Sequence, residues 1–329
     1  MTRRRLGPAR SWRRVRKIMA GPLIVLAIAA TMASCSDGHL VTSGASTRHE
    51  AEPSAGCAHR APKDVVAAGG EQTRSLQSGT VTGTFELSVP RTYRPRHPSA
   101  LILAFYGFGS DPAQFAALTK LPERGSTDGY LVVVPHTQGS ESEWQLNARG
   151  TDAAFVDGVV NFVETTYCID RGSVFAAGFS AGAAFTIIYS CARQSRVTAI
   201  ATVAVEFQLG CTRPMPILAF HGTADPLVPF RNGAIGLSLP GIKVRGTQLN
   251  MGDWARLDRC RVAARRRRIG SQVILQQWDR CRRATAVALY TVVGGGHSWP
   301  GADSKDALGL TTQQVNATAE MLSFFGRYR

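Results

Sequence analysis

The sequence predicts an α/β domain with a mostly parallel central sheet flanked by helices. Apolar segments of strand length alternate along the chain with longer segments whose apolar residues recur at helical spacing. Several of the strand segments are continuously apolar, as expected of strands that are buried on both faces. The chain has 329 residues, of which 44% are hydrophobic and 19% charged, enough for one large core. Strands that alternate with helices over such a length favour a parallel sheet.

The first half of the chain contains three strand candidates and two helix candidates. Residues 80–89 alternate between apolar and polar side chains and end at Pro90. Residues 100–105 and 130–135 are continuously apolar, which predicts central strands, and the first of them runs into a glycine-containing loop. Helices are expected at residues 113–121 and 152–168, the second with an apolar stripe.

The second half continues the alternation. Residues 173–177 form a short apolar strand, and residues 181–193 read as a buried helix because apolar and small side chains dominate. Composition predicts further strands at 198–205, 216–220 and 286–293, and a closing helix at 311–328. Residues 233–270 are polar and irregular, with one helix expected around 248–258.

The N-terminal residues predict export. Residues 1–35 hold eight basic and no acidic side chains, and the apolar stretch from Ile18 to Met32 is short for a membrane span. That stretch ends in Met32-Ala33-Ser34-Cys35, which resembles a bacterial lipobox. We therefore expect a lipoprotein-type signal peptide at 1–35, with lipidation at Cys35 anchoring the protein to the outer face of the cell membrane. The alternative is a plain cleaved signal, which would release the protein.

The segment 36–56 is rich in Ser, Gly, Thr and charged residues, so we expect a flexible spacer before a catalytic domain at 57–329. Six cysteines follow Cys35, namely Cys57, Cys168, Cys191, Cys211, Cys260 and Cys281. An even number in an exported chain predicts three disulfides of open connectivity. A pairing of Cys260 with Cys281 is a guess, based on their positions on either side of an arginine-rich segment. No cysteine spacing is typical of zinc, so no metal site is predicted.

The formal charge of +15 does not by itself indicate nucleic acid. Eight of the basic residues lie in the signal, and much of the remaining excess lies in Arg261 and Arg265 to Arg268. Because no aromatic side chains interleave with this run, we expect a solvated basic loop and no nucleic-acid partner. Attraction of this loop to anionic lipid headgroups or cell-wall polymers is the alternative.

The segment Gly178-Phe179-Ser180-Ala181-Gly182 lies between a predicted strand and a predicted helix. A G-x-S-x-G sequence in this context is a nucleophile elbow, a sharp turn that exposes the serine hydroxyl at the sheet edge. Ser180 is therefore the expected catalytic nucleophile. The oxyanion hole is expected to use the amides of Ala181 and, in the early glycine loop, Phe108.

A serine hydroxyl needs an adjacent base that a third group orients, and in α/β-hydrolases the acid and the histidine follow the serine in that order. His297 is the last of the seven histidines and lies in a glycine-rich loop directly after a strand, which we expect to be mobile. Five carboxylates lie between Ser180 and His297, namely Glu206, Asp225, Asp253, Asp258 and Asp279. Asp225 is preferred because it lies in a turn after a strand, with Glu206 as the runner-up. His221, before Gly222, is expected to be a structural turn residue.

The chain resembles the polyhydroxybutyrate depolymerase and feruloyl esterase family of secreted α/β-hydrolases from about Cys57 onward. The resemblance is carried by the segments Phe85-Glu86-Leu87-Ser88-Val89-Pro90, Gly178-Phe179-Ser180-Ala181-Gly182, His221-Gly222-Thr223-Ala224-Asp225 with Val228-Pro229-Phe230, and Gly295-Gly296-His297-Ser298-Trp299-Pro300. It implies an α/β-hydrolase fold, a Ser180-Asp225-His297 triad, and no metal or cofactor. Tyr106-Gly107 stands where the family usually has His-Gly, so we expect altered loop geometry without loss of activity.

These observations predict a serine esterase that acts on short-acyl, feruloyl-type or hydroxyalkanoate esters. A small ester is favoured over a polymer because no separate polymer-binding module is recognised. Trp144, Phe230 and Trp299 are expected to line an aromatic acyl pocket, with ordinary core packing as the alternative. The rival functions are a peptidase on the same fold and a non-catalytic envelope lipoprotein that binds a glycan or a host partner. The acyl and alcohol groups, the oligomeric state and the physiological role stay open.

Overall fold

The computed structural model describes residues 50–59, 66–139, 143–235, 243–261, 263–303 and 307–329. The expected signal peptide, Cys35 and most of the expected spacer lie outside these residues. Over the described ranges, none of the helices combines the length and apolar character needed to cross a bilayer.

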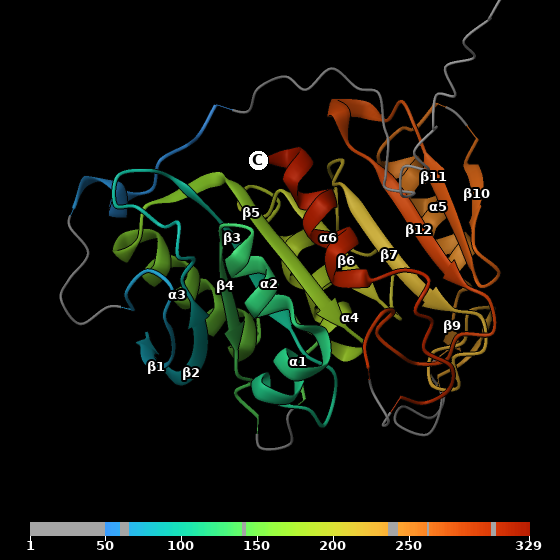
Figure 1. Ribbon diagram of the computed structural model, residues 1–329, viewed down its shortest axis with the longest axis horizontal. Helices are drawn as coiled ribbons and strands as arrows, with labels where there is room; N and C mark the ends of the chain where they lie inside the picture. Colours follow the sequence, from blue (N-terminus) through green and yellow to red (C-terminus); the bar gives the residue numbers. More distant parts are fainter. Residues whose placement is uncertain (1–49, 60–65, 140–142, 236–242, 262, 304–306) are drawn as a thin grey trace, which may run out of the picture. The chain divides into compact units, whose positions relative to one another are not determined.

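The described domain is built on a ten-stranded sheet with the order β1-β2-β4-β3-β5-β6-β7-β12-β11-β10 (Figure 1). Its centre is a parallel block formed by β3 (Ser99–Phe105), β4 (Tyr130–Pro135), β5 (Ile169–Phe179), β6 (Ala199–Val203), β7 (Ile217–Gly222) and β12 (Val287–Val292). Almost every residue of this block is buried, which agrees with the continuously apolar sequence of several of these strands.

An antiparallel hairpin extends the sheet at each side. On one side β1 (Glu71–Ser78) pairs with β2 (Val81–Ser88), and β2 pairs with β4. On the other side β10 (Arg265–Ile269) pairs with β11 (Val273–Trp278), and β11 pairs with β12. A separate short pair is formed by β8 (Gly233–Ala234) and β9 (Lys243–Val244).

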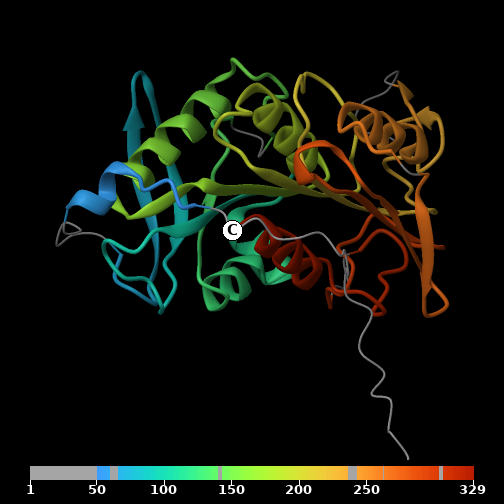
Figure 2. The same ribbon diagram turned by 90° about the horizontal axis from the view of Figure 1, so that it is seen from above.

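Helices cover both faces of the sheet (Figure 2). One face carries α3 (Thr151–Thr166), α4 (Ala181–Ala192) and α5 (Thr247–Leu257), and the other carries α1 (Pro112–Thr119), α2 (Leu121–Thr127) and α6 (Ala317–Phe325). Three short 3-10 helices span Ala55–Ala58, Arg282–Ala284 and Gly326–Tyr328. The core therefore lies in two layers, one between each face of the sheet and its helices.

The expected basic loop is wrong, because Arg265 to Arg268 form most of strand β10. This strand lies at the edge of the sheet and its four arginines are exposed, so the apolar periodicity of a buried strand is missing. Charged side chains on an edge strand also oppose pairing with other chains. Strands β1 and β11 and helix α2 were not expected from the sequence either. The closing helix is shorter than predicted because it begins at Ala317, where the Asn316 side chain accepts from the Ala319 amide and caps it.

Three disulfides are confirmed, and so is the guessed pairing of Cys260 with Cys281. The other two join Cys57 to Cys168 and Cys191 to Cys211. The domain begins a few residues earlier than expected, because the end of the predicted spacer is attached to it. The amide of Ser54 donates to the Ile169 carbonyl at 2.8 Å, and the Glu52 amide donates to the Asp170 carboxylate at 2.8 Å.

Candidate active site

Ser180 lies in the sharp turn between β5 and α4, as the elbow motif predicts. Its backbone has φ 54° and ψ −120°, a left-handed region that a residue with a Cβ rarely adopts. The two motif glycines allow the close crossing. A Cβ on Gly178 would lie 2.3 Å from the Gly182 carbonyl oxygen, and one on Gly182 would lie 2.2 Å from that of Phe105. The spacing of the motif is therefore a steric requirement of the turn.

The glycine loop after β3 lies beside Ser180. A Cβ on Gly107 would be 3.5 Å from the Cβ of Ser180, and the Ser110 amide closes the turn by donating to the Gly107 carbonyl at 3.2 Å. The side chain of Phe108, inside this turn, is 53% exposed. Ala181 is the first residue of α4, so its amide has no acceptor within the helix. These are the two amides that the sequence predicts for an oxyanion hole.

Tyr106 connects this loop to residues outside it by hydrogen bonds. Its hydroxyl accepts from the Thr137 amide at 2.8 Å, and its carbonyl accepts from the indole nitrogen of Trp144 at 2.8 Å. The ring is buried, and this burial raises the pKa of the phenol above its ordinary value. Tyr106 therefore acts on the loop by packing and hydrogen bonding.

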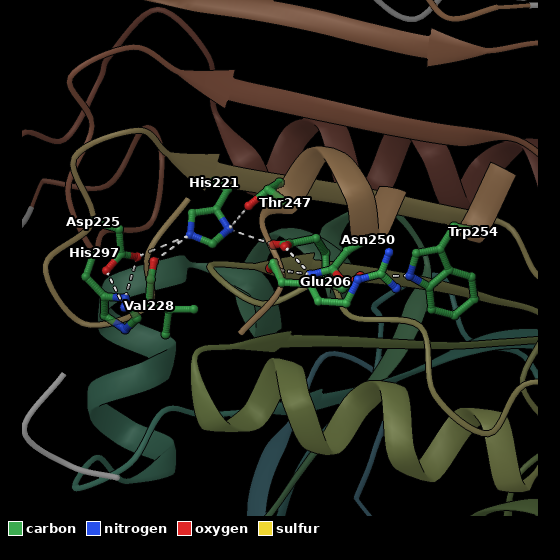
Figure 3. A network of polar contacts seen from close by, with 9 residues as sticks. Glu206, His221, Asp225, Val228, Thr247, Asn250, Trp254 and His297 are labelled. Carbon is green, nitrogen blue, oxygen red and sulfur yellow. Dashed lines mark hydrogen bonds and ion pairs between the residues drawn. The ribbon is translucent and has the colours of Figure 1, made fainter. Parts of the chain in front are cut away.

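Asp225 and His297 are directly paired. The Nδ1 atom of His297 lies 2.8 Å from Oδ2 of Asp225, and Oδ1 of Asp225 accepts from the amides of Leu227 and Val228 at 2.8 and 2.9 Å (Figure 3). Burial alone would raise the pKa of Asp225, but the bond and charge of His297, the Val228 amide and the charge of His221 together hold it below its ordinary value. Asp225 is therefore an ionised partner for the imidazole.

The loop that carries His297 is joined to a neighbouring segment by backbone hydrogen bonds. The His297 amide donates to the Leu308 carbonyl at 2.9 Å, and the Gly296 amide donates to that of Leu310 at 3.0 Å. The glycines permit close packing, because a Cβ on Gly296 would lie 2.0 Å from the Leu308 carbonyl oxygen. The ring of His297 also contacts the ring of Phe179, with centroids 5.0 Å apart, which places it beside the elbow.

His221 and Glu206 form a second buried pair behind Asp225 (Figure 3). Nδ1 of His221 lies 2.6 Å from the Glu206 carboxylate, and its Nε2 lies 2.9 Å from the Val228 carbonyl and 3.7 Å from Asp225. His221 is therefore a residue of β7 with a buried ring, and the expected role in a turn is wrong. Glu206, the runner-up acid, is bonded to His221, whereas Asp225 is bonded to His297.

This arrangement favours a charged His221. A carbonyl oxygen can only accept, so Nε2 must carry a proton in order to bond Val228. Nδ1 lies at hydrogen-bond distance from the Glu206 carboxylate, and this contact requires a second proton between Nδ1 and the carboxylate oxygen. Burial lowers the pKa of His221, but the charge and hydrogen bond of Glu206, the Val228 carbonyl and the charge of Asp225 outweigh it and raise the pKa. The cation supports the loop that carries Asp225, a role that sequence spacing does not reveal because Glu206 lies on a different segment.

The three predicted pocket aromatics have different environments. Trp144 and Trp299 are each 1% exposed, and both indole nitrogens donate to protein oxygens. They pack against Phe185 and Phe115 respectively, so the alternative of core packing describes both. Phe230 is half-buried and contacts the ring of His221, with centroids 5.7 Å apart. In the described parts of the chain, no group of three or more His, Cys, Asp or Glu side chains is arranged to hold a metal ion.

Comparison with known proteins gives partial relatives and a clear fold. No family model matches the chain. It is 29% identical over 155 residues to a probable feruloyl esterase C of Aspergillus flavus, covering 45% of this chain and 56% of that protein. It is 28% identical over 203 residues to feruloyl esterase D of Neurospora crassa, covering 57% and 66%. The chain thus spans about half to two thirds of the length of these curated relatives.

Among solved structures, the chain is similar to an acetyl xylan esterase from Aspergillus awamori. The TM-score is 0.57 at 12% sequence identity, and the superposition covers 79% of this chain and 100% of the other. At this identity the likeness concerns the fold alone. Together with the parallel sheet and the helices on both faces, it establishes the expected α/β-hydrolase fold.

Proposed function

We propose that this protein is a serine-dependent carboxylic-ester hydrolase. The observation that carries the proposal is the strained turn at Ser180, which lies beside a hydrogen-bonded and buried Asp225–His297 pair. The feruloyl esterase names of the partial relatives support the same class of reaction.

In the proposed mechanism, Ser180 Oγ attacks the ester carbonyl carbon while Nε2 of His297 accepts its proton. Asp225 holds Nδ1–H of the same ring and stabilises the imidazolium that forms. The oxyanion of the tetrahedral intermediate receives hydrogen bonds from the amides of Ala181 and Phe108. His297 then donates its proton to the leaving alcohol, and the acyl group stays on Ser180. Water then attacks the acyl carbon while His297 accepts its proton, and His297 returns that proton to Ser180 Oγ as the carboxylic acid leaves.

For the substrate, we propose a feruloyl or short-acyl ester, with hydroxyalkanoate esters less favoured. The names of the partial relatives support a feruloyl-type acyl group. Of the three predicted pocket aromatics, Phe230 is only half-buried and lies near the loop that carries Asp225. We therefore assign Phe230 to the acyl pocket. Three disulfides support an exported enzyme, since such bonds persist in oxidising compartments. Lipidation at Cys35 is a further proposal.

The test compares the purified protein with Ser180→Ala on p-nitrophenyl acetate, p-nitrophenyl butyrate and methyl ferulate. We expect turnover by the parent and a loss of at least ~10⁴-fold in kcat for the variant, because the nucleophile is removed. The ranking of the three substrates distinguishes the short-acyl from the feruloyl assignment. A folded parent that is no faster than Ser180→Ala on all three esters would contradict the proposal and favour the peptidase or the binding protein.

A further inference from the structure

Five arginines line one pocket near the amino-terminal ends of strands β7 and β12, opposite the end of these strands at which the proposed catalytic residues lie. The pocket has a volume of about 460 Å³, a size in the range of small-molecule sites. Its arginines come from three segments of the chain and are Arg213, Arg256, Arg259, Arg282 and Arg283. All five are exposed to solvent. We call this group the arginine pocket.

The arginine pocket has little compensating negative charge. The Arg256 guanidinium pairs with Asp253, which also binds Arg245. The guanidinium groups of the other four arginines make no hydrogen bond or ion pair with any described residue. Asp258 lies buried nearby, but burial raises the pKa of its carboxyl to about 7, so it is only partly charged at neutral pH. Gathering like charges in a concave surface is unfavourable unless an anion neutralises them.

The arginine pocket is held in a defined shape. The disulfide between Cys260 and Cys281 joins two of its segments, and the Arg282 amide donates to the Asp258 carbonyl at 2.7 Å. Arg259 and Arg283 have φ of 50° and 56°, a left-handed conformation that is uncommon for residues other than glycine. The disulfide and the strained turns hold these charged side chains in place. Such backbone strain is typical of functional surfaces and not of solvated loops.

The arginine pocket is separate from the proposed catalytic site. Arg213 precedes β7 and Arg282 precedes β12, whereas Asp225 and His297 follow these two parallel strands. Six residues of strand place the two ends about 20 Å apart, at ~3.3 Å per residue. A ligand in the arginine pocket would therefore leave the site at Ser180 open.

We propose that the arginine pocket binds a ligand with several clustered phosphate groups. The donors of a planar guanidinium match two phosphate oxygens at once. Four guanidinium groups without an acidic partner favour a ligand that carries more than one negative charge. None of the residues that line the pocket is aromatic, so nothing there would stack on a nucleobase. The concave shape favours a ligand that enters the pocket over a flat membrane surface. This inference does not depend on the proposed esterase activity.

The probe is sodium tripolyphosphate, titrated calorimetrically into the purified protein at constant ionic strength. We expect saturable one-to-one binding that weakens about tenfold or more in Arg213→Gln/Arg282→Gln, since both changes remove unpaired guanidinium groups. Neither residue has positive φ, so the backbone conformation is kept, and equal melting temperatures would show it. The matched control is Arg266→Gln/Arg268→Gln on β10, which removes the same charge outside the pocket and should keep the parent affinity.

Three results would overturn the proposal. The first is the absence of saturable binding of tripolyphosphate to the parent. The second is an equal loss of affinity in the control variant, which would mean that only net charge matters. The third is binding to phosphatidylglycerol vesicles without binding to tripolyphosphate, which would assign the arginines to a membrane surface.

Discussion

Among individual residues, His221 shows how a buried ring can connect the loop that carries Asp225 to a carboxylate on another segment. Its ring bridges the Glu206 carboxylate and the Val228 carbonyl, and Val228 also donates its amide to Asp225. The Thr247 hydroxyl lies 3.0 Å from the same ring nitrogen as Glu206, and Asn250 donates to Glu206 at 3.2 Å. The position of the Asp225 carboxylate thus depends, through Val228 and His221, on Glu206 and on residues of helix α5 (Figure 3).

We therefore expect His221→Gln to lower kcat on a small ester by ~10–100-fold with little change in KM, because a displaced Asp225 orients His297 less well.

The same variant should also change the dependence of stability on pH. The raised pKa of His221 gives a contribution that is complete below about pH 6.5 and is lost as the pH rises through the folded-state pKa. Urea unfolding at several pH values should show a larger loss of stability above pH 6.5 in the parent than in the variant, which keeps only the dependence due to other groups such as Asp258.

The control for His221→Gln is Thr247→Val, which removes one hydroxyl contact but leaves the ring and Glu206 in place. This variant should keep kcat within a few-fold of the parent. If His221→Gln raised KM and left kcat unchanged, or if both variants behaved alike, the supporting role of the cation would be contradicted.

Asp258 provides the clearest dependence of stability on pH. Burial raises the pKa of its carboxyl to about 7 in the folded protein, against about 3.9 for an unperturbed aspartate. Between these values the folded state holds a proton that the unfolded state has lost, so its contribution to stability falls as the pH rises and stays low above pH 7. The upper limit of this loss is about 4 kcal/mol, at about 1.4 kcal/mol per pKa unit.

We expect Asp258→Asn to unfold at a higher temperature than the parent at pH 8. A neutral amide can be buried without the desolvation cost that a charged carboxylate has at this pH. It can still accept from the Met215 amide, which donates to Asp258 at 3.0 Å. The difference in melting temperature should shrink toward pH 4, where the carboxyl is protonated as well. A variant that is less stable than the parent at pH 8 would show that the charge is well accommodated.

Among secondary-structure elements, the junction of β5 with α4 is determined by steric exclusion. The helix crosses so close to β3 and to the end of β5 that carbonyl oxygens occupy the places where Cβ atoms of Gly178 and Gly182 would lie. Backbone atoms cannot move aside as a flexible side chain can, so these positions exclude every residue except glycine. The strained Ser180 is thereby held by rigid elements on both sides.

We expect Gly182→Ala to destabilise the fold by about 1–3 kcal/mol or more and to lower kcat, because the new methyl group overlaps the Phe105 and Tyr106 carbonyls. The matched control is Gly252→Ala in α5, where no atom lies within 4 Å of the added Cβ. That change should stabilise the protein by about 0.5–1 kcal/mol. Thermal unfolding of both variants tests the argument, which fails if Gly182→Ala is as stable as the parent.

In the molecule as a whole, three disulfides join segments of very different separation. Cys57 and Cys168 are 111 residues apart, and their bond attaches the start of the domain to the start of β5. Cys191 and Cys211 are 20 residues apart and connect the end of α4 to the segment before β7. If disulfides act mainly by restricting the unfolded chain, the longer loop contributes more to stability.

We expect Cys57→Ser/Cys168→Ser to lose about 1.5 kcal/mol more free energy of unfolding than Cys191→Ser/Cys211→Ser, because loop-closure entropy grows with the logarithm of loop length. Denaturant unfolding of the two variants, at equal protein concentration, measures the difference. An equal loss, or a larger loss for the shorter loop, would mean that native packing around the sulfur atoms outweighs the entropy of the unfolded chain.

The sequence by itself determined the central strands, the outer helices except α2, and the elbow at Ser180. These features depend on residues close together in the chain: continuous apolar runs, helical spacing, and two glycines around a serine. The even number of cysteines also predicted three disulfides, whereas their connectivity, apart from the guessed pairing of Cys260 with Cys281, required the structure.

Only the tertiary structure decided which residues meet across the sheet. The edge strands β1 and β10 lack the apolar periodicity of buried strands because solvent reaches them, so their pairing depends on the neighbouring strand. Strand β11 lies between β12 and β10, and polar residues interrupt its apolar sequence. The bonds of Asp225 to His297 and of Glu206 to His221 join segments 72 and 15 residues apart. The arginine pocket likewise combines three segments. Such contacts are fixed by the packing of the whole chain. The order of motifs and the family resemblance predicted the pair of Asp225 with His297, whereas no local pattern predicted the pair of Glu206 with His221 or the arginine pocket.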